Sequence, residues 1–80
     1  MAPKRNDAAI ALGRRLRQLR ELRDWTQEQL AERADIQRTY VAECEAGKRN
    51  PSLKHLDKLA SAFKVRIADL FLDRYSPDRP

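Results

Sequence analysis

Apolar residues recur at three- and four-residue steps over most of this 80-residue chain. This spacing is typical of helices that bury one face. The first such run begins at Ala8 and passes through Ile10 or Leu12, Leu16, Leu19 and Leu22 or Arg23. Asp24 interrupts the repeat, and we expect Trp25 to pack as a hydrophobic staple before the next helix. The run therefore predicts a long first helix.

Two further apolar runs lie in the second half of the chain. Pro51 cannot continue a helix and Ser52 is a good N-cap, so a helix is predicted from Leu53 to Phe63. Its apolar stripe consists of Leu53, Leu56, Leu59, Ala60 and Phe63. A shorter helix is predicted over residues 65–72, with apolar side chains at Ile67, Leu70, Phe71 and Leu72. The chain is therefore expected to be all-α.

Residues 26–47 predict two short helices joined by a tight turn. The Thr26 hydroxyl can accept a backbone N–H of the first helix, and Gln29 can reach back to complete a capping box. Asp35 follows at the corner, since Asp tolerates turn and left-handed conformations unusually well. Ile36 is expected to bury the corner.

The second of these helices is predicted over residues 37–46, with Gly47 as its C-terminal cap. Val41 and Cys44 fall on its inner face. Its outward face carries Gln37, Arg38, Thr39, Tyr40 and Glu43. A merely solvated face would favour Lys and Glu pairs, whereas Arg can bond guanine bidentately and the Thr methyl can pack on the thymine methyl. In a helix-turn-helix the N-terminal residues of the second helix reach the bases, so this stretch predicts a DNA-reading helix.

Length, composition and charge limit the number of domains and the class of binding partner. Hydrophobic content of 41% and charged content of 36% suit one small helical domain, which we place at residues 8–72. Residues 1–7 and 73–80 are expected to be flexible tails. The formal charge is +5 and twelve of the seventeen basic residues are arginine, a preference that fits phosphate and base contacts. Lys4 and Arg5 form either a basic arm that reaches DNA or a mobile terminus.

Other kinds of site find little support in the sequence. Cys44 is the single cysteine, so we exclude an internal disulfide and interpret it as a core residue, with a redox sensor as the alternative. His55 has no partner at catalytic or metal-ligating spacing, so we expect a surface residue, no enzyme, no metal and no cofactor. No apolar run reaches the roughly 18 residues that span a bilayer, and residues 1–13 do not fit a signal peptide. We therefore expect a cytoplasmic protein with no membrane partner.

Residues 8–71 resemble the DNA-binding domain of the phage-repressor/Cro (XRE-like) family of helix-turn-helix regulators. The family pattern Thr/Ser-Gln-Glu-x-Leu-Ala is present at residues 26–31, and its closing Glu-x-Gly and downstream Pro are Glu45, Gly47 and Pro51. The apolar positions of the motif are Leu30, Ala34, Ile36, Val41 and Cys44. The resemblance implies a compact five-helix lambda-repressor-like fold. Within the family, RTYV followed by E-x-GKRNPS is similar to the controller proteins of restriction–modification systems, which are domain-only dimers that regulate their own operon.

The resemblance also implies roles for individual residues. Base or groove contacts are expected at Gln37, Arg38, Thr39, Tyr40 and Glu43, and phosphate contacts at Gln27, Lys48, Arg49, Asn50 and Ser52. Arg20 and Glu45 match a structural pair that bridges the first and third helices. Glu43 departs from the family pattern, because a carboxylate on the DNA side repels phosphate unless it pairs with Arg or accepts from a cytosine amine. Further departures are Asp24 and Asp35 in place of Gly, and Gln37 and Arg66 in place of capping Ser or Thr.

These observations favour a sequence-specific transcription regulator that binds double-stranded DNA and controls its own gene. Family members are often dimeric, which implies a homodimer on a palindromic operator with half-sites about 34–36 Å apart. The candidate dimer surface is Ile67, Leu70, Phe71 and Leu72. RNA polymerase is a further candidate partner, and a single domain offers no visible pocket for a small-molecule ligand. Two alternatives remain: an antitoxin-type protein-interaction module that also binds its own promoter, which a neighbouring toxin gene would favour, and a basic amphipathic binder of membrane surfaces.

Overall fold

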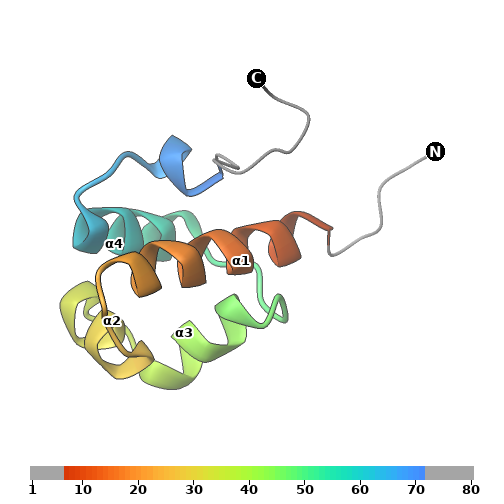
Figure 1. The fold of residues 1–80 in the computed structure, drawn as a ribbon. Helices are drawn as coiled ribbons and strands as arrows, with labels where there is room; N and C mark the ends of the chain where they lie inside the picture. The colour runs from red at the N-terminus through yellow and green to blue at the C-terminus, as the bar shows by residue number, and fades with distance from the viewer. Residues whose placement is uncertain (1–6, 72–80) are drawn as a thin grey trace.

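Four α-helices and one 3-10 helix make up residues 7–71, the part of the chain that the computed structural model describes. The α-helices are α1 (Asp7–Leu22), α2 (Gln27–Ala34), α3 (Arg38–Glu45) and α4 (Leu53–Phe63), and the 3-10 helix is η1 (Ile67–Phe71). In Figure 1, α1 crosses the middle of the molecule, with α2 and α3 on one side of it and η1 on the other. Asp7, which we assigned to the N-terminal tail, begins α1. The rest of both predicted tails, with Lys4 and Arg5, lies outside the described residues.

The prediction of five α-helices is wrong in its last element. Residues 67–71 form the 3-10 helix η1, where an α-helix over residues 65–72 was expected from the apolar spacing. The backbone N–H of Asp69 donates to the carbonyl of Arg66 at 2.9 Å, and the Asp69 carboxylate accepts from the backbone N–H of Arg66 at 3.0 Å. These two bonds close a tight turn, which suits the 3-10 geometry that proteins use in short pieces. Leu70 is thereby fully buried.

Each of the five elements contributes to one hydrophobic core. Its largest fully buried side chains are Leu16, Leu30, Val41, Cys44, Leu59, Phe63 and Leu70. The Trp25 ring stacks on Phe63 with ring centroids 5.6 Å apart, so Trp25 covers the edge of this core between α1 and α2. Leu22 and Leu53 do not join it: they are 73% and 71% exposed. Both lie at helix ends, Leu22 as the last residue of α1 and Leu53 as the first of α4.

All four α-helices end in the same backbone arrangement. After each helix one residue has a positive φ, and the N–H of the following residue returns to the carbonyl five positions back, as in a Schellman motif. The four positive-φ residues are Asp24, Asp35, Gly47 and Lys64. Asp24 and Asp35 therefore occupy left-handed positions where family members usually have glycine, at φ 56° and 57°. Lys64 at φ 59° is a third such position, which the sequence analysis missed.

Gly13 allows α1 and α3 to approach very closely. A Cβ at this position would lie 2.5 Å from the carbonyl oxygen of Cys44 and 2.6 Å from that of Glu45. The end of α3 is therefore pressed against the middle of α1, and only glycine fits at the crossing. This contact leaves the opposite end of α3, its first turn, at the surface.

Candidate nucleic-acid interface

The turn between α2 and α3 is built by local hydrogen bonds that the sequence predicts. Thr26 Oγ1 accepts from the N–H of Gln29 at 3.0 Å, and the N–H of Thr26 donates to Gln29 Oε1 at 2.8 Å, which confirms the capping box. Asp35 turns the chain in the left-handed conformation, and the N–H of Ile36 donates to the carbonyl of Ala31 at 2.9 Å. The two helices are thereby held as one unit against α1 and α4 (Figure 1).

The first turn of α3 presents polar side chains to solvent. Gln37 is the N-cap residue, not the first helical residue, and its side chain makes no capping hydrogen bond. Gln37, Arg38 and Thr39 are exposed, whereas Val41 and Cys44 on the inner face are buried. These five residues lie on the faces predicted for them. The exposed end of α3 is the part of the surface that could enter a DNA groove.

Tyr40 differs from the expectation that it projects freely from α3. Its side chain is half-buried, because its ring stacks on the imidazole of His55 with centroids 4.1 Å apart and planes 18° from parallel. The guanidinium carbon of Arg49 lies 4.6 Å from the centroid of the Tyr40 ring, which suits a cation–π contact. Tyr40 therefore joins α3 to the loop after it and to α4.

Glu43 pairs with an arginine, one of the two arrangements that would make an acidic residue tolerable at this position. Its carboxylate accepts from Arg49 Nε at 2.8 Å, and the side chains are 46% and 45% exposed. The hydrogen bond to Glu43 raises the pKa of Arg49. Arg49, expected to contact phosphate, is thus already bonded to a carboxylate in the protein without DNA.

Gln27 and the Arg20–Glu45 pair form one network beneath α2 and α3. Arg20 Nε and Nη2 donate to the two carboxylate oxygens of Glu45 at 2.7 and 3.0 Å, so the predicted structural pair forms. Gln27 Nε2 donates to Glu45 Oε1 at 3.0 Å, which directs its side chain toward the protein. The Gln27 side chain, expected to contact phosphate, is thus bonded to a carboxylate within the protein.

The loop between α3 and α4 carries the remaining expected phosphate contacts. Lys48 and Asn50 are exposed. Ser52 caps α4: its hydroxyl accepts from the N–H of His55 at 3.2 Å and lies 2.7 Å from His55 Nδ1. The Ser52 side chain thus has partners within the chain.

His55 is the residue at this surface that sequence reasoning missed. It was expected to be a surface residue without a role, and it instead supports Tyr40 by stacking and holds Ser52 by a hydrogen bond. The available signal was local: His55 follows the predicted N-cap Ser52 by three residues, so its side chain lies on the first turn of α4.

The candidate dimer surface is partly wrong. Leu70 is fully buried within the core, so it cannot contact a second subunit. Phe71 is 54% exposed and Ile67 is half-buried, while Leu72 lies outside the described residues. Leu70 was assigned to the dimer surface on the assumption that the core was filled without the last helix. Instead η1 packs against both α1 and α4, so its inner residue Leu70 is part of the core.

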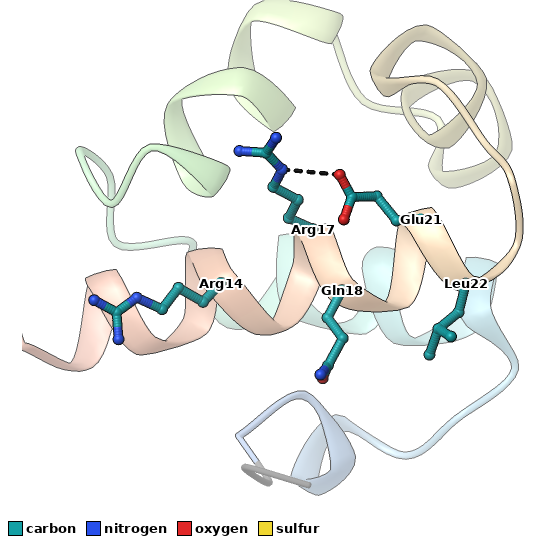
Figure 2. Close-up of a pocket in the computed structure, with 5 residues that line it drawn as sticks. All are labelled: Arg14, Arg17, Gln18, Glu21 and Leu22. Carbon is teal, nitrogen blue, oxygen red and sulfur yellow. Dashed lines mark hydrogen bonds and ion pairs between the residues drawn. The ribbon is translucent and has the colours of Figure 1, made fainter. Parts of the chain in front are cut away.

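The outward side of α1 bears an open hollow, not an enclosed pocket. Figure 2 shows its lining residues, Arg14, Arg17, Gln18, Glu21 and Leu22, with Arg17 Nε bonded to the Glu21 carboxylate at 3.0 Å. Within residues 7–71 no group of three His, Cys, Asp or Glu side chains is placed to hold a metal ion. No helix in the same range is both long enough and apolar enough to cross a bilayer.

Comparison with known proteins agrees with this geometry. The HTH_3 helix-turn-helix family matches residues 16–70. The chain is 41% identical over 69 residues to control protein C.MunI of Mycoplasma sp., covering 85% of this chain and 93% of that one. It is 37% identical over 59 residues to the immunity repressor of Bacillus phage phi105, covering 74% of this chain but only 41% of the repressor.

A solved structure is also similar. The crystal structure of the restriction–modification controller protein C.AhdI from Aeromonas hydrophila matches with a TM-score of 0.77 and 40% identity, over 79% of this chain and 96% of that one. The fold is therefore lambda-repressor-like, although its fifth element is a 3-10 helix. From the matched sequence, the helix-turn-helix geometry and these relatives together, the chain belongs to the phage-repressor/Cro-type (XRE-like) helix-turn-helix family of DNA-binding transcription regulators.

Proposed function

We propose that this protein is a sequence-specific regulator that binds a palindromic operator as a homodimer and controls its own gene. The observation that carries the proposal is the exposed first turn of α3, where Arg38 and Thr39 stand clear of the core. Direct reading of bases needs such side chains at the N-terminal end of the second helix of the motif.

Base contacts are assigned to the outward residues of α3. Arg38 suits guanine because it can donate two hydrogen bonds to the O6 and N7 atoms, and Thr39 suits the thymine methyl. Gln37 at the N-cap suits adenine, because its side-chain amide can donate to the N7 atom and accept from the N6 amine. Tyr40 and Glu43 are assigned to the groove edge, because both are already held by neighbouring side chains.

Phosphate contacts are assigned to the two segments that flank α3. Lys48 and Asn50 are exposed in the loop that follows it, and Arg49 lies between them. On the other side, the backbone N–H groups at the start of α2, near Gln27, attract phosphate through the positive end of the helix. Contacts of this kind hold the protein on DNA without selecting a sequence.

Dimerisation is assigned to the exposed apolar surface at the end of η1. Phe71 is 54% exposed, and Ile67 in the same element is half-buried. Two copies joined here would need to present their α3 helices about 34–36 Å apart to fit successive turns of one DNA face.

Autoregulation in the manner of a restriction–modification controller is supported by the relatives. Two of them, C.MunI and C.AhdI, are named as control or controller proteins, and this chain covers more than nine-tenths of each. In this proposal the operator lies beside the protein's own promoter, where RNA polymerase is the second partner.

The proposal is tested by footprinting the purified protein on the DNA upstream of its own gene. We expect protection of two half-sites related by a two-fold axis, and a dimer by light scattering at micromolar concentration. Replacing Phe71 with Asp should produce monomers and weaken operator binding. Protection of no site, or of a site that random DNA competes for equally well, would overturn the assignment of sequence-specific binding.

A further inference from the structure

We propose that Glu43 restrains the affinity of this surface for the DNA backbone by competing with phosphate for the guanidinium of Arg49. The inference rests on the proposed function and deepens it, since it names a residue that limits binding to DNA of arbitrary sequence. Glu43 accepts from Arg49 Nε at 2.8 Å. Their side chains are 46% and 45% exposed, so both stay accessible to a ligand on this face.

Arg49 is held in one place by more than its carboxylate partner. Its guanidinium lies over the ring of Tyr40, 4.6 Å from the ring centroid, and the Tyr40 ring is itself stacked on His55 with centroids 4.1 Å apart. His55 is in turn bonded to Ser52 at the start of α4. A continuous column of side chains therefore connects α3, the loop and α4, and Arg49 is preorganised within it.

The ion pair changes what this loop offers to a DNA backbone. Sequence-independent binding depends on neutralising phosphates and releasing their counterions. A lone arginine would supply one positive charge for that purpose, but Arg49 together with Glu43 has no net charge. A phosphate must therefore either break the Arg49–Glu43 ion pair or bind Arg49 next to the negative Glu43 carboxylate. Either cost weakens the contact between Arg49 and the phosphate.

Contacts to base edges are affected much less. Arg38 and Thr39 lie in the first turn of α3, before Glu43, and their hydrogen bonds and methyl contacts are made only with the right bases. The carboxylate thus lowers affinity for every sequence through the backbone while leaving the operator-specific contacts in place. Operator and random duplex are therefore weakened by about the same factor, and binding to both depends less steeply on salt than it would with a lone arginine.

The test compares Glu43→Gln with Glu32→Gln. Glu32 is exposed on α2, so the second variant makes the same change in net charge away from Arg49. Affinities for a random duplex and for the footprinted operator are measured between about 50 and about 200 mM salt. We expect Glu43→Gln to bind random duplex and operator more tightly, by about the same factor. The slope of the logarithm of the binding constant against the logarithm of the salt concentration should become steeper by about 0.9. Glu43→Gln should therefore lose roughly 3.5-fold more affinity across that range than the unmodified protein does.

A second pair of variants tests whether Glu43 acts through Arg49. In an Arg49→Gln background, Glu43→Gln should no longer steepen the salt dependence, because no guanidinium is released. Without DNA, the Arg49 Nε–H proton should exchange with water more slowly in the unmodified protein than in Glu43→Gln, as NMR can measure. Circular dichroism verifies that each variant is folded.

The outcomes separate this inference from the proposed function. Equal effects of Glu43→Gln and Glu32→Gln, a slope change that persists without Arg49, or equal Nε–H exchange would each overturn the role of Glu43 while leaving operator binding intact. Failure of the unmodified protein to prefer its operator would overturn the proposed function. In that case the salt dependence on random duplex and the Nε–H exchange still decide whether Glu43 competes with phosphate.

Discussion

Arg20 and Glu45 form a bidentate ion pair that is almost closed to solvent, with side chains 12% and 4% exposed. The hydrogen bond to Glu45 raises the pKa of Arg20, against the opposing effect of burial. Arg20 Nη1 also donates to the carbonyl of Trp25 at 2.7 Å, so the same side chain ties α3 to α1 and to the entry of α2. The orientation of α3 depends on this contact, because water cannot readily replace either partner.

Replacing Arg20 with Met should destabilise the fold strongly. Removing one partner leaves a buried charge without its counterion, which costs about 3–5 kcal/mol. The matched control is Arg17→Met, which breaks the exposed Arg17–Glu21 pair on the same helix and should cost about 0.3–0.5 kcal/mol. Urea denaturation measures both. Similar losses would show that the buried pair contributes no more than the exposed one.

Replacing Gly13 with Ala should also destabilise the protein. Helix propensity alone predicts a gain of about 0.5–1 kcal/mol for this change. The added Cβ would lie 2.5 Å from a backbone oxygen of α3, so the helices must separate, at a cost of about 1–3 kcal/mol. Thermal or urea unfolding shows whether the change raises or lowers the free energy of unfolding. A stabilised variant would contradict the close crossing of α1 and α3.

Replacing Lys64 with Gly should stabilise the protein by up to about 1 kcal/mol. Lys64 is exposed and has a φ of 59°, a conformation that costs a residue with a Cβ but not glycine. As a control, Ser61→Gly at an exposed position in the last turn of α4 should lose up to about 0.5 kcal/mol. The two changes place glycine at a left-handed cap and at a helical position of the same segment, so a loss in both would argue against the left-handed cap.

Cys44 should make stability fall at alkaline pH. Burial raises the pKa of its thiol from a usual value near 9 to about 11. The unfolded chain therefore loses the thiol proton first, so this contribution is fully present below about pH 9 and is lost as pH rises to about 11. Measured by urea denaturation across this range, the free energy of unfolding should fall more steeply with pH for the unmodified protein than for Cys44→Ala. Parallel curves would mean that the thiol is accessible.

Arg38 and Lys48 should affect DNA binding in different ways. Arg38→Ala should cost about 1–3 kcal/mol on the operator and relax the preference at one base position. Lys48→Ala should weaken all sequences about equally and lower the salt slope by about one. Competition binding with operator variants and random duplex measures both. Identical behaviour on the two kinds of DNA would contradict the division between base and phosphate contacts.

Local patterns alone were enough to predict much of the fold. The capping box of Thr26, the left-handed turn at Asp35 and the start of α4 after Ser52 depend on hydrogen bonds between residues a few positions apart. The inner face of α3 followed from helical spacing in the same way. Such features form within one or two turns of chain, so the order of residues is sufficient to specify them.

Predictions about the interface were less complete, because they concern neighbours from different segments. Glu43 was known to need a partner, but the choice of Arg49 depends on the path of the loop after α3. Tyr40 was expected to be outward-facing, and His55 from α4 holds it half-buried. Neither contact is indicated by the spacing of residues along the chain.

The helices, most of their caps and the face of α3 that carries Arg38 and Thr39 could be predicted from the order of residues alone, because they depend on short-range spacing and backbone preference. Three features could be learned only from the folded chain: η1 buries Leu70, α1 and α3 touch at Gly13, and Arg49 is bonded to Glu43 in the protein without DNA. These depend on how closely distant segments pack, and packing distance is set by the volume of all the side chains in the core together.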